Sequence, residues 1–170
     1  MNALALVPLL PLLGFLVNGM VGARLPRAWV SIVGCVLPAL SFVLTARLFL
    51  ELRAGEAAIS TTLFTWAALP GFTVDASLHF DAVAAVMCGI VTGVGTLIHV
   101  YSIGYMHGDR GYARYFAYLN LFLFFMLLLV LGSNLLVMFV GWEGVGLCSY
   151  LLIGFWFSKK SANDAGKKAF

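Results

Sequence analysis

The stretch Leu135–Phe157 reads LLVMFVGWEGVGLCSYLLIGFWF and contains a single charged residue, Glu143. At about 1.5 Å of rise per helical residue, this apolar run is long enough to cross the roughly 30 Å hydrocarbon core of a bilayer, with Glu143 near its middle. A carboxyl group at that depth costs on the order of 2.5–3.5 kcal/mol to insert, so it usually faces a protein interior or a water-filled path. The stretch therefore predicts a transmembrane helix whose carboxyl group handles ions or protons.

The composition extends this prediction to the whole chain. Of its 170 residues, 62% are hydrophobic and only 10% are charged, and the mean hydropathy is +1.02. Soluble domains carry about 25% charged residues, so this composition indicates an integral membrane protein. The net charge of +3 does not indicate nucleic-acid binding, because the basic residues lie in short loops. The three cysteines lie inside apolar spans, where they are expected to be buried small side chains.

Periodicity predicts an all-α polytopic membrane protein with five transmembrane helices. The expected spans are about 4–21, 29–49, 82–105, 115–131 and 135–157. Residues 161–170 look like the start of a truncated sixth helix, so the chain is expected to be an N-terminal fragment of a longer protein.

Loop charges predict an orientation in the membrane. The connections after spans one, three and five carry most of the basic residues: Arg24, Arg27, Arg110, Arg114, Lys159, Lys160, Lys167 and Lys168. Because basic loops remain on the cytoplasmic side, the N-terminus is expected to lie outside.

A different periodicity occupies the connection between spans two and three. Apolar and polar residues alternate from Phe72 to Phe80, which is typical of a strand, and residues 60–66 are rich in threonine and aromatics. The dipeptide Pro70-Gly71 between the two runs fits a type II turn. We therefore predict an extracytoplasmic β-hairpin near residues 60–80, with an irregular amphipathic loop as the alternative.

Helical spacing places Glu143, Gly146 and Tyr150 on one face of the fifth span. Gly146 leaves room beside the carboxyl group, and Tyr150 offers a hydroxyl about 10 Å further toward the cytoplasm. Glu143 is therefore the candidate proton-transfer residue and Tyr150 a candidate for its path. The alternative is that Glu143 is a neutral structural anchor, hydrogen-bonded to a neighbouring helix. Another stripe of small residues is expected to pack against a helix: Gly141, Gly144 and Cys148.

Other ionisable residues give weaker signals. His99, near the cytoplasmic end of span three, is a candidate proton relay or equally a hydrogen-bonding core residue. Asp81 is expected to cap span three, with a proton-exit role for Asp81 and His79 as the less favoured interpretation. Asp109 and Arg110 are expected to form a surface ion pair of little energetic weight.

Three motifs carry a family resemblance. They are GWEGVGLCSYLLIGFW at 141–156, FDAVAAVM at 80–87, and HVYSIGYM at 99–106 followed by RYF at 114–116. These motifs resemble the subunit L family of proton-translocating NADH:quinone oxidoreductase, respiratory complex I, whose mitochondrial homologue is subunit 5. The resemblance covers essentially the whole chain and is most specific from about Phe64 onward. It implies the first two transmembrane helices in 1–63, a subunit 5-type N-terminal segment in 64–115, and the start of an antiporter-like domain in 130–170.

The resemblance also implies a function. It suggests a multi-pass subunit of the bacterial inner membrane that takes part in proton translocation coupled to NADH:quinone electron transfer. Its expected partners are the lipid bilayer and other membrane subunits of complex I, with no nucleic acid. In this family Glu143 would pair with a lysine of helix seven, beyond residue 170. FMN, Fe–S clusters and quinone would belong to other subunits, and no cofactor or metal is expected in this chain.

Other functions remain open at the level of sequence. An Mrp-type cation/proton antiporter subunit would share the fold and the intramembrane glutamate. The amino-acid sequence of the motif around Glu143 favours complex I over this alternative. A membrane-bound hydrogenase subunit is a related but weaker alternative. A non-transporting structural subunit is the alternative from a different class.

Overall fold

A computed structural model describes residues 3–55 and 58–169 and contains five membrane-length helices within those ranges. The elements are, in order, α1 (Ala3–Met20), η1 (Gly22–Arg24), α2 (Arg27–Arg53), β1 (Ile59–Leu69), β2 (Phe72–Phe80), α3 (Ala82–Tyr105), α4 (Tyr112–Leu131), α5 (Leu135–Ile153) and α6 (Lys160–Ala169). Helices α1 to α5 are long and apolar enough to cross a membrane. The predicted all-α polytopic fold is therefore confirmed.

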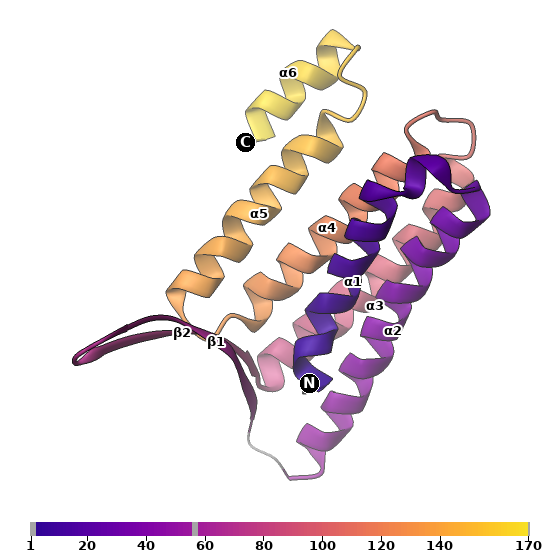
Figure 1. The fold of residues 1–170 in the computed structure, drawn as a ribbon. Helices are drawn as coiled ribbons and strands as arrows, with labels where there is room; N and C mark the ends of the chain where they lie inside the picture. The colour runs from indigo at the N-terminus through magenta and orange to yellow at the C-terminus, as the bar shows by residue number, and fades with distance from the viewer. Residues whose placement is uncertain (1–2, 56–57, 170) are drawn as a thin grey trace.

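Helix α4 is the centre of the helical assembly. It packs against α1, α2, α3 and α5, whereas α5 packs mainly against α4 and α6. Figure 1 shows α1 to α4 grouped together, with α5 on the far side of α4 and α6 turning back beside α5. Most of the surface of α5 is therefore not covered by the other described elements.

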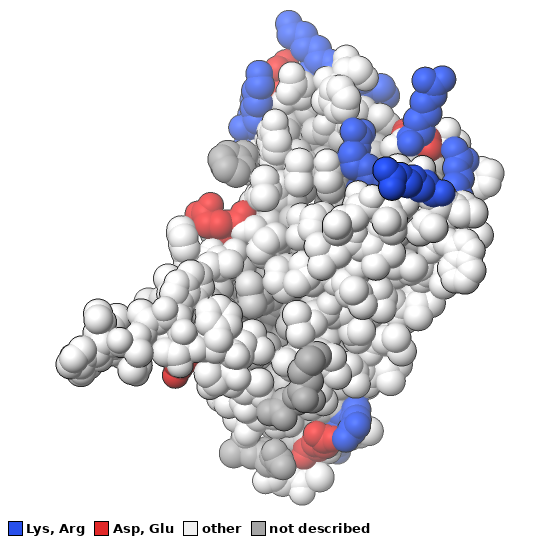
Figure 2. All heavy atoms as spheres, in the orientation of Figure 1, with Lys and Arg blue, Asp and Glu red and all other residues white. Residues whose placement is uncertain are grey.

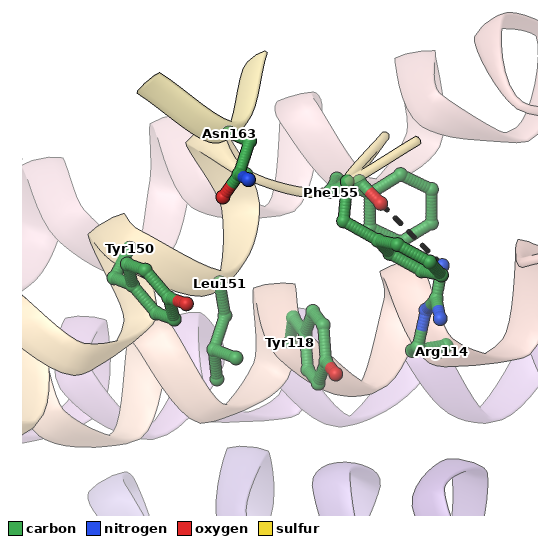
Figure 3. A pocket seen from close by; sticks show the side chains of 8 residues that line it. Arg114, Tyr118, Tyr150, Leu151, Phe155 and Asn163 are labelled. Atoms are coloured by element: carbon green, nitrogen blue, oxygen red, sulfur yellow. Dashed lines mark hydrogen bonds between the residues drawn. The ribbon is translucent and has the colours of Figure 1, made fainter. Parts of the chain in front are cut away.

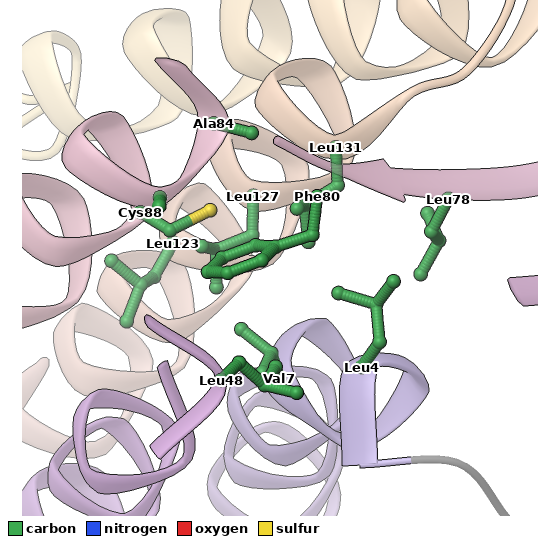
Figure 4. Close-up of a cluster of buried hydrophobic side chains, with 11 residues drawn as sticks. Leu4, Val7, Leu48, Leu78, Phe80, Ala84, Cys88, Leu123, Leu127 and Leu131 are labelled. Carbon is green, nitrogen blue, oxygen red and sulfur yellow. The ribbon is translucent and has the colours of Figure 1, made fainter. Parts of the chain in front are cut away.

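A buried apolar cluster holds the bundle together where the hairpin meets it. Leu78 and Phe80 of β2 are fully buried there against Val7 of α1, Cys88 of α3 and Leu127 of α4 (Figure 4). Since lipid is as apolar as these side chains, close packing rather than removal from water favours their association.

The hairpin forms as predicted. Strands β1 and β2 pair antiparallel, with Leu69 opposite Phe72 across the turn. Gly71 has a φ of +81°, the left-handed conformation that the third position of a type II turn requires. In Figure 1 the tip of the hairpin projects away from the bundle.

The base of the hairpin fixes the start of α5. The Ser133 amide donates to the carbonyl of Ser77 at 3.1 Å, and the Asn134 side-chain amide donates to the carbonyl of Asp75 at 2.7 Å. Asn134 also caps α5, because its Oδ1 accepts from the Val137 amide at 3.0 Å. The expected cap on α3 is confirmed in the same way, since Asp81 Oδ1 accepts from the Ala84 amide at 2.8 Å.

Helix α5 ends earlier than the sequence predicts, at Ile153 rather than Phe157. Phe155 turns into the bundle, where its ring meets that of Tyr115 edge-on at 5.4 Å and lies 4.7 Å from the Arg114 guanidinium. A glycine contact lets α6 return along α5, because a Cβ on Gly166 would lie only 3.3 Å from the Cα of Gly154. The apolar residues after Ile153 are thus used in this turn instead of extending the span.

Basic side chains gather at one end of the molecule, which we call the basic end. It comprises the connections after α1, α3 and α5, and Figure 2 shows lysine and arginine side chains concentrated there. Asp109 ties these connections together: its Oδ1 accepts from the Gly111 amide at 2.6 Å and its Oδ2 from the Trp156 indole at 2.9 Å. Arg27 Nη2 donates to the Asp109 carbonyl at 3.4 Å. The expected Asp109–Arg110 ion pair was wrong, since the carboxylate is used by these two donors.

We expect Asp109→Ala to loosen this junction at low cost to the bundle. The hydrogen bond from Trp156, followed by that from Gly111, lowers the pKa of Asp109 below its usual 3.8. A lowered pKa means that the carboxylate stabilises the folded junction at neutral pH. That contribution is complete above about pH 4 and is lost as the pH falls through the lowered pKa. Because the site is solvent-exposed, the loss should be about 1 kcal/mol or less.

Hydrogen exchange of residues 106–111 and 154–158 measures this effect. Asp109→Ala should exchange faster than the wild type at neutral pH, whereas the neighbouring Arg110→Ala should not. Equal exchange in Asp109→Ala and wild type would contradict the role of the carboxylate.

Candidate functional site

One face of α5 is shaped to fit α4. A Cβ on Gly141 would lie 2.5 Å from the backbone nitrogen of Leu129, and a Cβ on Gly144 would lie 2.1 Å from the Phe125 ring. Cys148, on the same stripe, is fully buried. The predicted packing role of these small residues is therefore confirmed.

Glu143 lies on a different face of α5 because it follows Gly141 by about 200° of helical rotation. Its side chain is exposed, as is that of Tyr150 on the same predicted face. Neighbouring residues of α5 at helical spacing from Glu143 are exposed as well: Leu136, Phe139 and Leu147. Within the described part of the chain, no basic side chain forms an ion pair with Glu143. The sequence led us to expect a protein interior or a water-filled path around this carboxyl group, and the described helices leave it on an outer face.

The carboxyl group is set in a groove rather than on a convex surface. Met126 and Leu129 of α4, Trp142 and Gly146 of α5, and Ala169 of α6 line this groove, whose volume is about 510 Å³. Among the described residues, and apart from the neighbouring backbone of α5 itself, nothing lies within 4 Å of a Cβ placed on Gly146, so the predicted space beside Glu143 is present.

A second groove of about 490 Å³ lies next to the first, toward the hairpin. It shares Leu129 and Trp142 with the Glu143 groove and also contains His79 and Asp81. Glu143 is about 12 Å along α5 from its first residue, at 1.5 Å per residue. The two neighbouring grooves thus lie between the depth of the carboxyl group and the hairpin end of the bundle.

Tyr150 lines a pocket of about 250 Å³ between α4, α5 and α6, near the basic end. Arg114, Tyr118 and Asn163 share this pocket, and Figure 3 shows the Tyr150 ring directed toward Leu151 and Tyr118. Polar side chains of α4 and α6 thus lie near Tyr150 in this pocket. A part for Tyr150 in a proton path stays a prediction.

His99 is not brought together with Glu143. It is buried inside the α1–α4 bundle, where its Nδ1 lies 2.7 Å from the carbonyl oxygen of Gly95 and its ring packs near Phe116. Two buried asparagines in the same region, Asn18 of α1 and Asn120 of α4, were missed in the sequence analysis. Their amide groups within apolar spans were the signal that could have identified them.

The titratable residues do not form an obvious metal centre. Among residues 3–55 and 58–169, no group of three or more His, Cys, Asp and Glu side chains is placed to hold a metal ion. On α5, Glu143 supplies a carboxyl group and Tyr150 a phenol, and both are groups that can exchange protons.

Known protein families match two parts of the chain. Residues 66–116 match the family described as NADH-Ubiquinone oxidoreductase (complex I), chain 5 N-terminus. Residues 132–170 match the family described as NADH:quinone oxidoreductase/Mrp antiporter, TM. Five membrane-length helices and a carboxyl group within the last of them agree with these matches. Over these residues the chain is therefore similar to the membrane proteins of complex I and of Mrp antiporters that the two families describe.

Among these membrane proteins the chain is similar, along its whole length, to subunit L of NADH-quinone oxidoreductase. It is 44% identical to subunit L of Escherichia coli (strain K12), over 100% of this chain and 28% of that protein. It is 43% identical to NADH-ubiquinone oxidoreductase chain 5 of Allomyces macrogynus, over 94% of this chain and 25% of that protein. The predicted resemblance is confirmed, and the chain spans about a quarter of the length of these relatives.

Solved structures show the same fold. A chain of the membrane-bound sulfane sulfur reductase, an archaeal respiratory membrane complex, superposes with a TM-score of 0.78 at 20% identity, over 98% of this chain and 24% of its own. A chain of the Mrp complex from Dietzia sp. DQ12-45-1b superposes with a TM-score of 0.70 at 25% identity, over 95% of this chain and 17% of its own. The helical arrangement is therefore shared with multi-subunit membrane complexes.

Proposed function

We propose that this chain takes part in proton translocation as part of an antiporter-like subunit of bacterial complex I, with Glu143 as the proton-transfer residue. The observation that carries the proposal is an exposed carboxyl group at mid-depth of α5, beside a groove of about 510 Å³. Lipid is an unfavourable neighbour for such a group, so a hydrated path or a covering helix has to meet it. Proton translocation by the full-length subunit carrying Glu143→Gln tests this function.

In the proposed mechanism Glu143 exchanges a proton with water in its groove. A cation supplied by another part of the subunit favours the carboxylate, and withdrawal of that cation favours the protonated form. Redox chemistry in other subunits of the complex drives the switch between these two states. FMN, Fe–S clusters and quinone belong to those subunits, so this chain contributes the proton-carrying group alone.

The same proposal includes an orientation in the membrane, a division of the chain into parts, and a set of partners. The basic end lies in the cytoplasm, which places the N-terminus and the hairpin outside the inner membrane. Residues 1–63 provide the first two helices, 64–115 the subunit 5-type segment, and 130–170 the start of the antiporter-like domain. The partners are lipid and the other membrane subunits of the complex. His99, inside the bundle, is a separate candidate relay.

An Mrp-type cation/proton antiporter subunit is the second candidate function. The family matched by residues 132–170 covers both complex I and Mrp proteins, and the fold is shared with an Mrp complex. The 44% identity to subunit L favours complex I. Copurification of the full-length subunit with NADH-oxidising activity would support complex I, whereas sodium/proton exchange without that activity would support Mrp.

We expect Tyr150→Phe to slow proton translocation without preventing assembly. The substitution removes only a hydroxyl from the pocket that also contains Arg114 and Asn163. Loss of one polar step in a path that water can partly replace should lower the rate by roughly two- to tenfold, up to about 1.4 kcal/mol in barrier. The initial rate of proton uptake into inverted membrane vesicles measures the effect.

Tyr105→Phe is the matched control for this prediction. Tyr105 is 55% exposed at the end of α3 and stacks on Tyr101, away from α5. Its variant should translocate protons at the wild-type rate. Equal rates for the two variants would remove Tyr150 from the path.

A further inference from the structure

Three buried side chains in the α1–α4 bundle each leave one polar atom without a hydrogen-bond partner among the residues that the structure describes. The atoms are Asn18 Oδ1, His99 Nε2 and Asn120 Oδ1. Their residues are 1%, 2% and 0% exposed. Buried polar atoms are nearly always paired, so three such atoms in one region call for a ligand.

All three atoms are hydrogen-bond acceptors. Asn18 Nδ2 donates to the carbonyl of Val30 at 3.2 Å, and Asn120 Nδ2 donates to the carbonyl of Phe116 at 2.9 Å. Because a carbonyl accepts only, these contacts fix the orientation of both amides and leave each Oδ1 as the free atom. By the same reasoning the Nδ1 of His99 carries the proton that the Gly95 carbonyl accepts, which leaves Nε2 of the neutral ring as an acceptor. None of the three atoms can therefore form a hydrogen bond with either of the others, because each of them only accepts.

The three side chains surround the same part of the bundle. Asn120 Nδ2 lies 3.3 Å from the carbonyl of Gly34, and Asn18 Nδ2 lies 3.3 Å from where a Cβ on Gly34 would be. The His99 ring centroid is 6.3 Å from that of Phe116, whose carbonyl accepts from Asn120. Residues of all four helices, α1 to α4, thus meet around Phe116 and Gly34.

Gly14 of α1 leaves room for the side-chain amide of Asn120. A Cβ on Gly14 of α1 would lie only 2.4 Å from Asn120 Oδ1, so no larger residue fits there without moving the amide. Asn18 also lines a groove of about 490 Å³ between α1 and α4, together with Ala117 and Arg114. This groove thus extends from Asn18 to Arg114 at the basic end.

We propose that Asn18, His99 and Asn120 form an internal water-binding site within the α1–α4 bundle. Water is the small neutral ligand that supplies two donors to a set of acceptors, and buried waters typically make about three hydrogen bonds to otherwise unpaired groups. The bound water donates to at least two of the three atoms and accepts from none of them. This inference is independent of the proposed function, because the site lies on α1, α3 and α4 and does not involve Glu143.

Cryo-electron microscopy of the full-length protein, at a resolution that shows ordered water, tests the site. The wild-type map should contain a density peak within hydrogen-bonding distance of at least two of the three acceptors. Gly14→Ala should abolish the peak by displacing Asn120. Gly19→Ala is the matched control on the same helix, because a Cβ there would make only ordinary contacts of 3.8 Å or more. Its map should keep the peak.

Two results would overturn the proposal. One is a wild-type map that shows ordered waters elsewhere in the bundle but none beside these atoms. The other is direct contact between His99 Nε2 and an asparagine Oδ1, which would mean that a protonated imidazole satisfies the acceptors instead. The wild-type map decides the question even if Gly14→Ala does not fold.

Discussion

Glu143→Gln is expected to abolish most proton translocation while leaving the assembled protein intact. Glutamine preserves the shape of the side chain and its capacity for hydrogen bonds, but it cannot take up or release a proton. Without that step the translocation rate should fall by at least about tenfold, equivalent to roughly 1.4 kcal/mol or more in barrier height. The measurement is proton uptake by inverted vesicles that contain the full-length subunit, divided by the rate of electron transfer.

Glu51→Gln is the control for this prediction, because it also removes one carboxylate. Glu51 lies in the last turn of α2 and pairs with Arg47 at 2.9 Å, with both side chains largely in the open. Removal of such an exposed i,i+4 pair should cost about 0.5 kcal/mol or less and should not change proton translocation. Normal pumping by Glu143→Gln would contradict the proton-carrying role. Failed assembly of Glu143→Gln would instead support the structural-anchor alternative.

The surroundings of Glu143 show what helical periodicity can predict. The stripe of Gly141, Gly144 and Cys148 identified the face of α5 that packs on α4, because small residues at three- to four-residue spacing permit close approach. The same periodicity placed Glu143 on another face. It could not show whether that face meets another described helix, since this depends on tertiary packing rather than on the sequence of one span. The exposure of Glu143 therefore emerged only from the structure.

Hydropathy predicted the five spans well because membrane crossing requires long apolar runs, but it misplaced the end of α5. Phe155 is as apolar as a span residue, yet it packs under Arg114 in a turn. A cation–aromatic contact of this kind is made between elements and leaves no local signal in the sequence. The amides of Asn18 and Asn120 are visible in the sequence as polar groups within apolar runs, but the groups that they contact depend on how the helices pack and could not be predicted.

Gly141→Ala is expected to weaken the contact between α4 and α5. The same addition of one methyl group at Gly146, which faces open space among the described residues, is not. The new Cβ of Gly141→Ala would lie 2.5 Å from the backbone nitrogen and 2.6 Å from the Cα of Leu129. Backbone atoms cannot rotate away as a side chain can, so the two helices have to separate along their length. Overpacking of this kind typically costs about 1–3 kcal/mol. Because α5 packs mainly on α4 and α6, few other contacts hold it in place.

Gly146→Ala isolates the packing effect from helix propensity. Both glycines lie inside α5, so alanine should favour the helical backbone by the same roughly 0.5–1 kcal/mol in each variant. Outside the adjoining backbone of α5, no atom of the residues that the structure describes lies within 4 Å of a Cβ on Gly146, so this variant should be as stable as the wild type or slightly more stable. Thermal denaturation of the detergent-purified full-length subunit should give a clearly lower melting temperature for Gly141→Ala alone. Equal melting temperatures for the two variants would mean that the helices separate at no cost, and that the close approach at Gly141 does not hold α5 against α4.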